Sequence, residues 1–155
     1  MIRAIRTDDC DAIAAIETQT FDTAFERGSL STFMKMRAFC GFVDDANIPN
    51  TAYEGNNLDM SSKLVGYLLA TIILDEAEIL SIAVSADYQK CGRGAGLLEH
   101  GVADVAEQGV KTVVLEGAAD TVSAFTRYER HGVVQSVRRR CSYNRSDGDC
   151  DAIMM

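Results

Sequence analysis

The chain has 155 residues, of which 47% are hydrophobic and 25% are charged, and its net charge is −8. This length and composition predict one globular domain over residues 1–155, and the acidic balance argues against nucleic acid as the main partner. No apolar run approaches the about 20 residues of a membrane span, and no signal peptide is evident. We therefore expect no membrane association and a cytoplasmic location.

The five cysteines contain no Cys-x-x-Cys pair, and with only two histidines the chain shows no zinc pattern. We therefore expect no metal, and the odd cysteine count fits reduced thiols in a cytoplasm. Most of the acidic excess falls in residues 1–79. It would favour a cationic amine as a substrate if that half faces the substrate, or it would serve solubility alone.

Hydrophobic periodicity predicts a strand over residues 2–5 and then a helix that follows N-cap candidates at positions 7–9 and ends at Glu17. An amphipathic helix is predicted over residues 29–39. Residues 18–27 and 41–50 are predicted as loops, the second of which contains the only proline.

The rest of the chain also reads as alternating strands and helices. Strands are expected over residues 51–54, 63–73 and 77–84, with a turn-rich segment at 55–62. After these strands we expect a helix over residues 92–108 closed by Gly109, a strand over 112–116, and a helix over 121–131 closed by Gly132. Residues 133–139 and 151–155 are expected to form a final hairpin. Antiparallel strands thus precede a β-α-β unit, which predicts a mixed α/β fold.

A glycine-rich loop, Gln-Lys-Cys-Gly-Arg-Gly-Ala-Gly at residues 89–96, lies between a predicted strand and a predicted helix. Glycines leave backbone N–H groups unshielded, and the helix start adds unpaired N–H groups and a positive dipole end, so the segment is suited to phosphate. A dinucleotide fingerprint would need glycine at Leu97, and no Walker sequence is present. The alternative is an ordinary tight turn between a strand and a helix.

The pattern Gln-x-x-Gly-x-Gly followed by Leu-Leu resembles the acyl-CoA pyrophosphate loop of the GCN5-related N-acetyltransferases (GNAT). The similarity continues over residues 74–84, 97–100, 109–110, 115–116, 147–148 and 151–154, where the chain resembles the RimI-type ribosomal-protein alanine N-acetyltransferases. The resemblance implies the GNAT fold, an α/β (α+β) architecture. In this fold a mixed, mostly antiparallel sheet has splayed parallel fourth and fifth strands and about four flanking helices. It also implies acetyl-CoA as cosubstrate.

The resemblance further implies which residues bind the cosubstrate. The strand backbone at Ile82, Ala83 and Val84 would bind the pantetheine arm and the thioester. Thr121 stands where the family usually has an Asn that contacts CoA. The loop would hold the pyrophosphate through Gln89, Lys90, Cys91, Gly92, Arg93, Gly94, Ala95 and Gly96. Cys91 is interpreted as a small loop residue, because nothing nearby in the sequence supplies a base for a reactive thiol.

Two further residues match catalytic positions of the family. Glu116, at the end of a strand, corresponds to the general base, and Tyr128, on the next helix, to the general acid. An amine must lose a proton to attack a thioester, and the departing thiolate must gain one. The alternatives are a solvated strand end for Glu116 and a core aromatic for Tyr128, since Phe125 lies one turn earlier.

The resemblance therefore implies an N-acetyltransferase that acts on a protein or peptide N-terminal amine, with a ribosomal protein among the candidate acceptors. A small amine or a lysine side chain is an alternative acceptor for the same chemistry. A CoA-binding module without catalysis is an alternative of a different class. Arg138, Arg139 and Arg140 are interpreted as a solvated strand face, with a contact to the CoA 3′-phosphate as the alternative.

Overall fold

The computed structural model describes residues 1–21, 27–49, 60–118, 137–143 and 150–154. In these residues seven strands form one sheet with the order β1-β2-β3-β4-β5-β7-β6. Neighbouring strands are antiparallel except β4 and β5, which are parallel. In chain order the strands are β1 (Ile2–Ala4), β2 (Phe39–Pro49), β3 (Met60–Ile73), β4 (Glu76–Val84), β5 (Thr112–Ala118), β6 (Val137–Tyr143) and β7 (Cys150–Met154).

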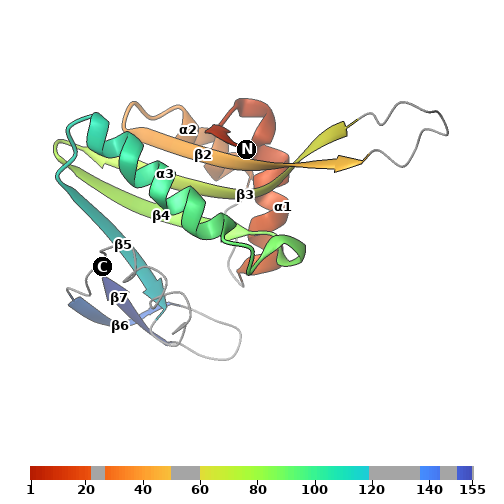
Figure 1. Ribbon diagram of the computed structural model, residues 1–155. Coiled ribbons are helices and arrows are strands. Elements are labelled where there is room, and N and C mark those ends of the chain that lie inside the picture. Colours follow the sequence, from red (N-terminus) through yellow and green to blue (C-terminus); the bar gives the residue numbers. More distant parts are fainter. Residues whose placement is uncertain (22–26, 50–59, 119–136, 144–149, 155) are drawn as a thin grey trace.

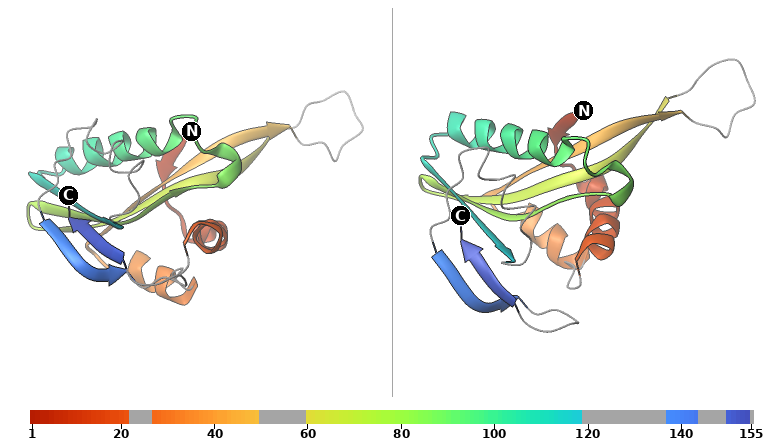
Figure 2. Two further views of the ribbon diagram at one scale, coloured as in Figure 1. Left: turned by 90° about the horizontal axis from the view of Figure 1, so that it is seen from below. Right: turned by 60° about the horizontal axis from the view of Figure 1, so that its bottom comes forward.

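Helices cover both faces of the sheet. Helix α3 (Arg93–Glu107) lies on one face, and α1 (Cys10–Thr20) and α2 (Arg27–Met34) lie on the other (Figure 1; Figure 2). Two short 3-10 turns, Thr7–Asp9 and Ala86–Tyr88, complete the helical segments of the described residues. The predicted fourth helix, over residues 121–131, falls outside the described residues.

Each face of the sheet carries its own buried cluster. On the α3 face, Leu97 and Leu98 pack with a group of sheet residues that includes Leu68. On the opposite face, Ile13 and Ile16 of α1 pack with a group that includes Val43. Apolar side chains therefore alternate between the two faces along the central strands, as expected for a sheet buried on both sides.

The parallel pairing of β4 and β5 is short. It runs from Glu76 opposite Thr112 to Ile79 opposite Leu115. Beyond this point β5 pairs with β7, starting at Glu116, while β4 continues to Val84. Figure 1 shows β5 turning away from β4. We call the point after Ile79 and Leu115 the splay; it confirms the expected divergence of the fourth and fifth strands.

A bulge in β4 lies at the same place. Ser81 is opposite Leu69 of β3, and Ile79 is opposite Ala70, so that Leu80 is an additional residue without a counterpart. A bulge bends and twists its strand locally. Here it accompanies the departure of β4 from β5.

Several sequence predictions are confirmed. The structure has strands close to the ranges expected at residues 2–5, 63–73, 77–84 and 112–116, and the last two strands form an antiparallel pair. Helix α3 ends at Glu107, and Gly109 follows with φ +91°, as expected for a C-terminal cap. The predicted strand at 51–54, most of the turn at 55–62 and the start of the predicted strand at 133–139 lie outside the described residues.

Other predictions for the N-terminal half were wrong. Helix α1 continues to Thr20, and α2 ends at Met34, so the helix expected over residues 29–39 is too long. Residues 41–50 were expected to form a loop, but Phe39–Pro49 forms β2. Pro49 is the last residue of this strand, where β2 pairs with β3 but not with β1, and a missing N–H costs little on such an edge.

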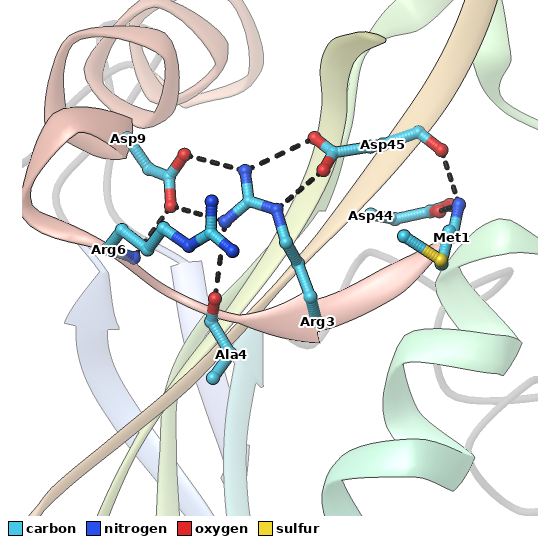
Figure 3. Close-up of polar contacts among 7 residues, drawn as sticks. All are labelled: Met1, Arg3, Ala4, Arg6, Asp9, Asp44 and Asp45. Atoms are coloured by element: carbon cyan, nitrogen blue, oxygen red, sulfur yellow. Dashed lines mark hydrogen bonds and ion pairs between the residues drawn. The ribbon is translucent and has the colours of Figure 1, made fainter.

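Ion pairs explain why the acidic middle of β2 forms a strand. Arg3 of β1 donates from Nε to Asp45 at 2.6 Å and from Nη1 and Nη2 to the two oxygens of Asp9 at 2.8 and 2.9 Å (Figure 3). The Met1 ammonium donates to Asp44 at 3.0 Å and to the carbonyl oxygen of Asp45. Asp44 and Asp45 are therefore buried with charged partners, which a polar sequence pattern alone does not indicate.

Candidate active site

The glycine-rich loop connects the end of β4 to the start of α3. The Gln89 side-chain amide donates to the Val84 carbonyl oxygen at 2.9 Å, which ties the loop back to the strand. Lys90 has φ +61° and Gly92 has φ +80°, so the chain adopts the left-handed conformation twice before the helix. A Cβ atom at Gly92 would meet nothing within 4 Å, so open space adjoins the backbone there.

The first turn of α3 offers unpaired donors next to this open backbone. Its first helical hydrogen bond runs from the Gly96 N–H to the Gly92 carbonyl oxygen at 2.9 Å. The N–H groups of residues 93–95 precede that bond and therefore have no acceptor within the helix. Free donors, an open glycine and a positive helix end together make a setting for an anion such as pyrophosphate.

Side chains of the loop differ in their surroundings. Lys90 and Cys91 are exposed, and the Cys91 thiol donates to the Gln89 carbonyl oxygen at 3.4 Å. Arg93 instead turns back to β2, where its Nη1 donates to Asp44 at 2.7 Å, and its guanidinium lies 5.7 Å from the centre of the Tyr88 ring. Because the Arg93 side chain is engaged in this ion pair, its backbone N–H is the group that it offers to an anion.

The segment Ile82, Ala83 and Val84 forms the last residues of β4, beyond the splay. Ala83 is buried on the α1 face, and Val84 is buried on the α3 face. The side chains are thus fixed in the two cores. The edge of the strand toward β5 has no pairing with β5 in this segment. Its backbone polar groups are therefore available to a ligand lying along that edge.

Glu116 is the first residue of β5 beyond the splay, since Leu115 makes the last pairing with β4 and Glu116 pairs with Met154 of β7. The structure thus places the Glu116 backbone, residues 82–84 and the loop on the same side of the splay, toward the carboxyl ends of β4 and β5. Tyr128 and Thr121 lie outside the described residues.

Sequence reasoning missed a buried polar cluster formed by Glu17, Tyr67 and Ser81. The hydroxyls of Tyr67 and Ser81 both donate to Oε1 of Glu17, the latter at 2.6 Å, and the two hydroxyl oxygens are 3.0 Å apart. Burial, together with the hydrogen bond to Glu17, raises the pKa of Tyr67 far above its usual value. The available signals were an acidic residue beside the apolar Ile13–Ile16 stripe and a serine within an apolar strand.

In the parts of the chain that the structure describes, no group of three or more His, Cys, Asp or Glu side chains could hold a metal ion. No helix of the described residues is long and apolar enough to span a membrane.

A sequence model of the acetyltransferase (GNAT) family matches residues 11–133, and the chain belongs to this family. It is therefore an acetyltransferase for which acetyl-CoA is the acetyl donor. It is 37% identical over 103 residues to [ribosomal protein bS18]-alanine N-acetyltransferase of Escherichia coli K12; the match covers 66% of this chain and 70% of that protein.

Solved structures agree with this assignment. The ribosomal-protein-S18-alanine N-acetyltransferase from Escherichia coli superposes with a TM-score of 0.82 at 28% identity, covering 100% of this chain and 90% of that one. Arabidopsis thaliana NAA60 in complex with a bisubstrate analogue superposes with a TM-score of 0.78 at 17% identity, covering 99% and 94%. The second similarity supports the fold alone.

Proposed function

We propose that the chain transfers the acetyl group of acetyl-CoA to the N-terminal α-amine of a protein or peptide. The observation that carries the proposal is the splay. There β4 and β5 separate, the phosphate-suited loop follows the end of β4, and Glu116 is the first β5 residue on the far side. The similarity to bS18-alanine N-acetyltransferases supports a protein N-terminus as acceptor and makes a ribosomal protein the first candidate.

The described residues fit the cosubstrate. In our proposal the backbone of Ile82–Val84 holds the pantetheine arm and the thioester along the free edge of β4. The loop and the first turn of α3 hold the pyrophosphate through backbone N–H groups, with Lys90 adding a positive charge. Thr121, which lies outside the described residues, is the last proposed contact with CoA, and its side chain is shorter than the Asn that the family usually has there.

Glu116 is the proposed general base. It accepts a proton from the acceptor ammonium, directly or through a water, so that the neutral nitrogen can attack the thioester carbon. Backbone N–H groups of β4 stabilise the negative charge that develops on the carbonyl oxygen. As the carbon–sulfur bond breaks, Tyr128 donates its phenolic proton to the sulfur. The second proton that the attacking nitrogen must lose to become an amide then returns to the Tyr128 phenolate. The thioester itself supplies an activated acyl group, so the chain needs only to position it and to move protons.

The relative acidity of amines favours an N-terminus over a lysine. A peptide α-amine titrates near pH 8, and a lysine amine titrates near pH 10.4. At neutral pH a much larger fraction of the α-amine is already neutral, so a single carboxylate base suffices. We further propose a cytoplasmic location, because the thiols of Cys40 and Cys91 are not oxidised to a disulfide.

Mass spectrometry of a single peptide with both a free N-terminal alanine and an internal lysine tests this proposal. After incubation with acetyl-CoA, fragment ions should place the acetyl group on the α-amine, and peptides beginning with Ser or Gly should behave alike. Exclusive lysine acetylation would show that the acceptor is a lysine side chain and not an N-terminus. Turnover with polyamines or other small amines only would show that the acceptor is a small amine. Acetyl-CoA binding without turnover of any amine would indicate a binding module.

A further inference from the structure

The buried cluster of Glu17, Tyr67 and Ser81 connects three elements of the fold. Glu17 lies in the last turns of α1, Tyr67 on β3 and Ser81 on β4. Glu17 is 2% exposed and Tyr67 is fully buried, so the contacts among the three side chains are shielded from water. The proposed reaction assigns no role to any of them.

A carboxylate in this position is not the most stabilising choice. Burial of a charge costs several kcal/mol unless hydrogen bonds or an opposite charge compensate for it. Two hydroxyl donors meet Oε1 of Glu17, and within the described residues no ion pair of Glu17 is present. Apolar side chains of similar volume would join α1 to the sheet at lower cost. What the polar cluster adds is directionality, because hydrogen bonds fix the rotation and position of the groups that they join.

The position that the cluster fixes is the splay. Ile79 makes the last pairing with β5, Leu80 is the additional residue of the bulge, and Ser81 is held by Glu17. Tyr67, which pairs with Ala83, reaches the same carboxylate from the neighbouring strand. The residues that follow at once, 82–84, have lost their pairing with β5. The cluster therefore holds β4 from the α1 face at the point where sheet pairing on one side stops.

We propose, on the basis of the function proposed above, that Glu17 is a positioning residue for acetyl transfer. Its carboxylate, acting through Ser81 and Tyr67, fixes the backbone of β4 so that the N–H groups beyond the bulge are aligned with the thioester carbonyl. Donor alignment stabilises charge that develops during the reaction, whereas the loop supplies most of the binding to CoA. Loss of the cluster should therefore lower kcat more than it raises the KM for acetyl-CoA.

Four variants test the positioning role. Ser81→Ala removes the hydroxyl that links Glu17 to β4, and Ser81→Thr keeps a hydroxyl there. Glu17→Gln keeps the shape of the side chain and one carbonyl acceptor while removing the charge. Asp45→Asn is the matched control, since Asp45 is also buried and hydrogen-bonded, to Arg3, but lies on β2 away from the splay.

The quantities to be measured for each variant are kcat and KM, the thermal midpoint, and the infrared carbonyl stretch of bound [1-¹³C]acetyl-CoA. Ser81→Ala should lower kcat about tenfold, change KM less than about twofold, and return the carbonyl stretch toward its value in free acetyl-CoA. Ser81→Thr should retain most of kcat and the bound frequency. Glu17→Gln should lower kcat by less, and adding it to Ser81→Ala should have little further effect, because the two residues act as one unit. Asp45→Asn should lower the thermal midpoint only.

Wild-type kcat and carbonyl frequency in folded Ser81→Ala and Glu17→Gln would overturn the inference. An equal loss of kcat in Asp45→Asn would also overturn it, because general destabilisation would then be sufficient to explain the lower kcat. A third contradicting result is a carbonyl stretch that does not change when acetyl-CoA binds to the wild type. The infrared measurement needs no acceptor substrate. If the wild type shifts the carbonyl stretch but acetylates no peptide α-amine, the proposed acceptor is wrong, and the comparison among variants still decides the role of Glu17.

Discussion

Glu116 is the residue on which proton removal depends in the proposed reaction. Replacement by Gln keeps the shape of the side chain and removes its basicity, so Glu116→Gln should lower kcat/KM by about 10²–10⁴ at neutral pH. The loss should shrink as the pH rises through about 8, because the α-amine then deprotonates without help. Steady-state rates between pH 6.5 and 9.5 measure this. A constant ratio of variant to wild type over that range would mean that Glu116 does not take the proton.

Gly92 and Gly109 form a matched pair for testing the loop. Their φ values are +80° and +91°, and a Cβ atom at either position meets nothing within 4 Å. Alanine should therefore cost about 1–2 kcal/mol of stability at both sites through backbone strain. Only Gly92→Ala should also weaken acetyl-CoA binding, because only Gly92 adjoins the proposed pyrophosphate site. Calorimetric titration of both variants measures this, and equal affinities would remove Gly92 from the site.

Asp9 gives a pH-dependent prediction for stability. The hydrogen bonds from Arg3 are the main cause that lowers the pKa of Asp9 below its usual value of about 3.8. A lowered pKa in the folded state means that the contribution to stability is complete above about pH 4 and is lost as the pH falls through the folded-state value. Asp9→Asn should therefore be less stable by about 1–3 kcal/mol at pH 7, with a smaller difference at pH 3. Urea unfolding at both values tests this. A difference that does not change with pH would assign the effect to packing.

At the scale of elements, α3 is held by its apolar face. Leu98 is 1% exposed and packs into the cluster on that side of the sheet, whereas Val102, one turn later, is 36% exposed. Leu98→Ala should lower the free energy of unfolding by about 2–5 kcal/mol, and Val102→Ala should change it by less than about 0.5 kcal/mol. Chemical denaturation measures both. A small cost at Leu98 would show that α3 is anchored elsewhere.

The sequence predicts the segment from β4 to β5 well and β2 poorly. Apolar residues, three glycines and a C-terminal cap at Gly109 give local signals that agree with one another, so tertiary contacts are not needed to interpret them. The acidic residues of β2 are compatible with a strand only because Arg3, Arg93 and the Met1 ammonium neutralise them. Those partners come from other parts of the chain, and a local pattern carries no information about them.

The sheet as a whole shows a similar division. A β-α-β unit predicts that β4 and β5 are parallel, and the family resemblance predicts their splay. Neither indicates the bulge at Leu80 or the Glu17 cluster beside it, because both depend on where α1 and β3 meet β4. For the candidate site, the sequence predicts residues 82–84, the loop and Glu116, and the structure places them on one side of the splay. Their roles, like those of Tyr128 and Thr121, stay predictions.

The most direct test of acetyl transfer to a peptide N-terminus is the affinity of two bisubstrate conjugates. In one, CoA is joined through an acetyl bridge to the α-amine of an alanine-initiated peptide. In the other, it is joined to the side chain of a lysine in the same peptide. The splay should accept both halves of the α-amine conjugate at once. Calorimetry should then show this conjugate binding at least about 10²-fold more tightly than CoA alone and more tightly than the lysine conjugate. Equal affinities of the two conjugates, or tighter binding of the lysine conjugate, would contradict acetyl transfer to a peptide N-terminus.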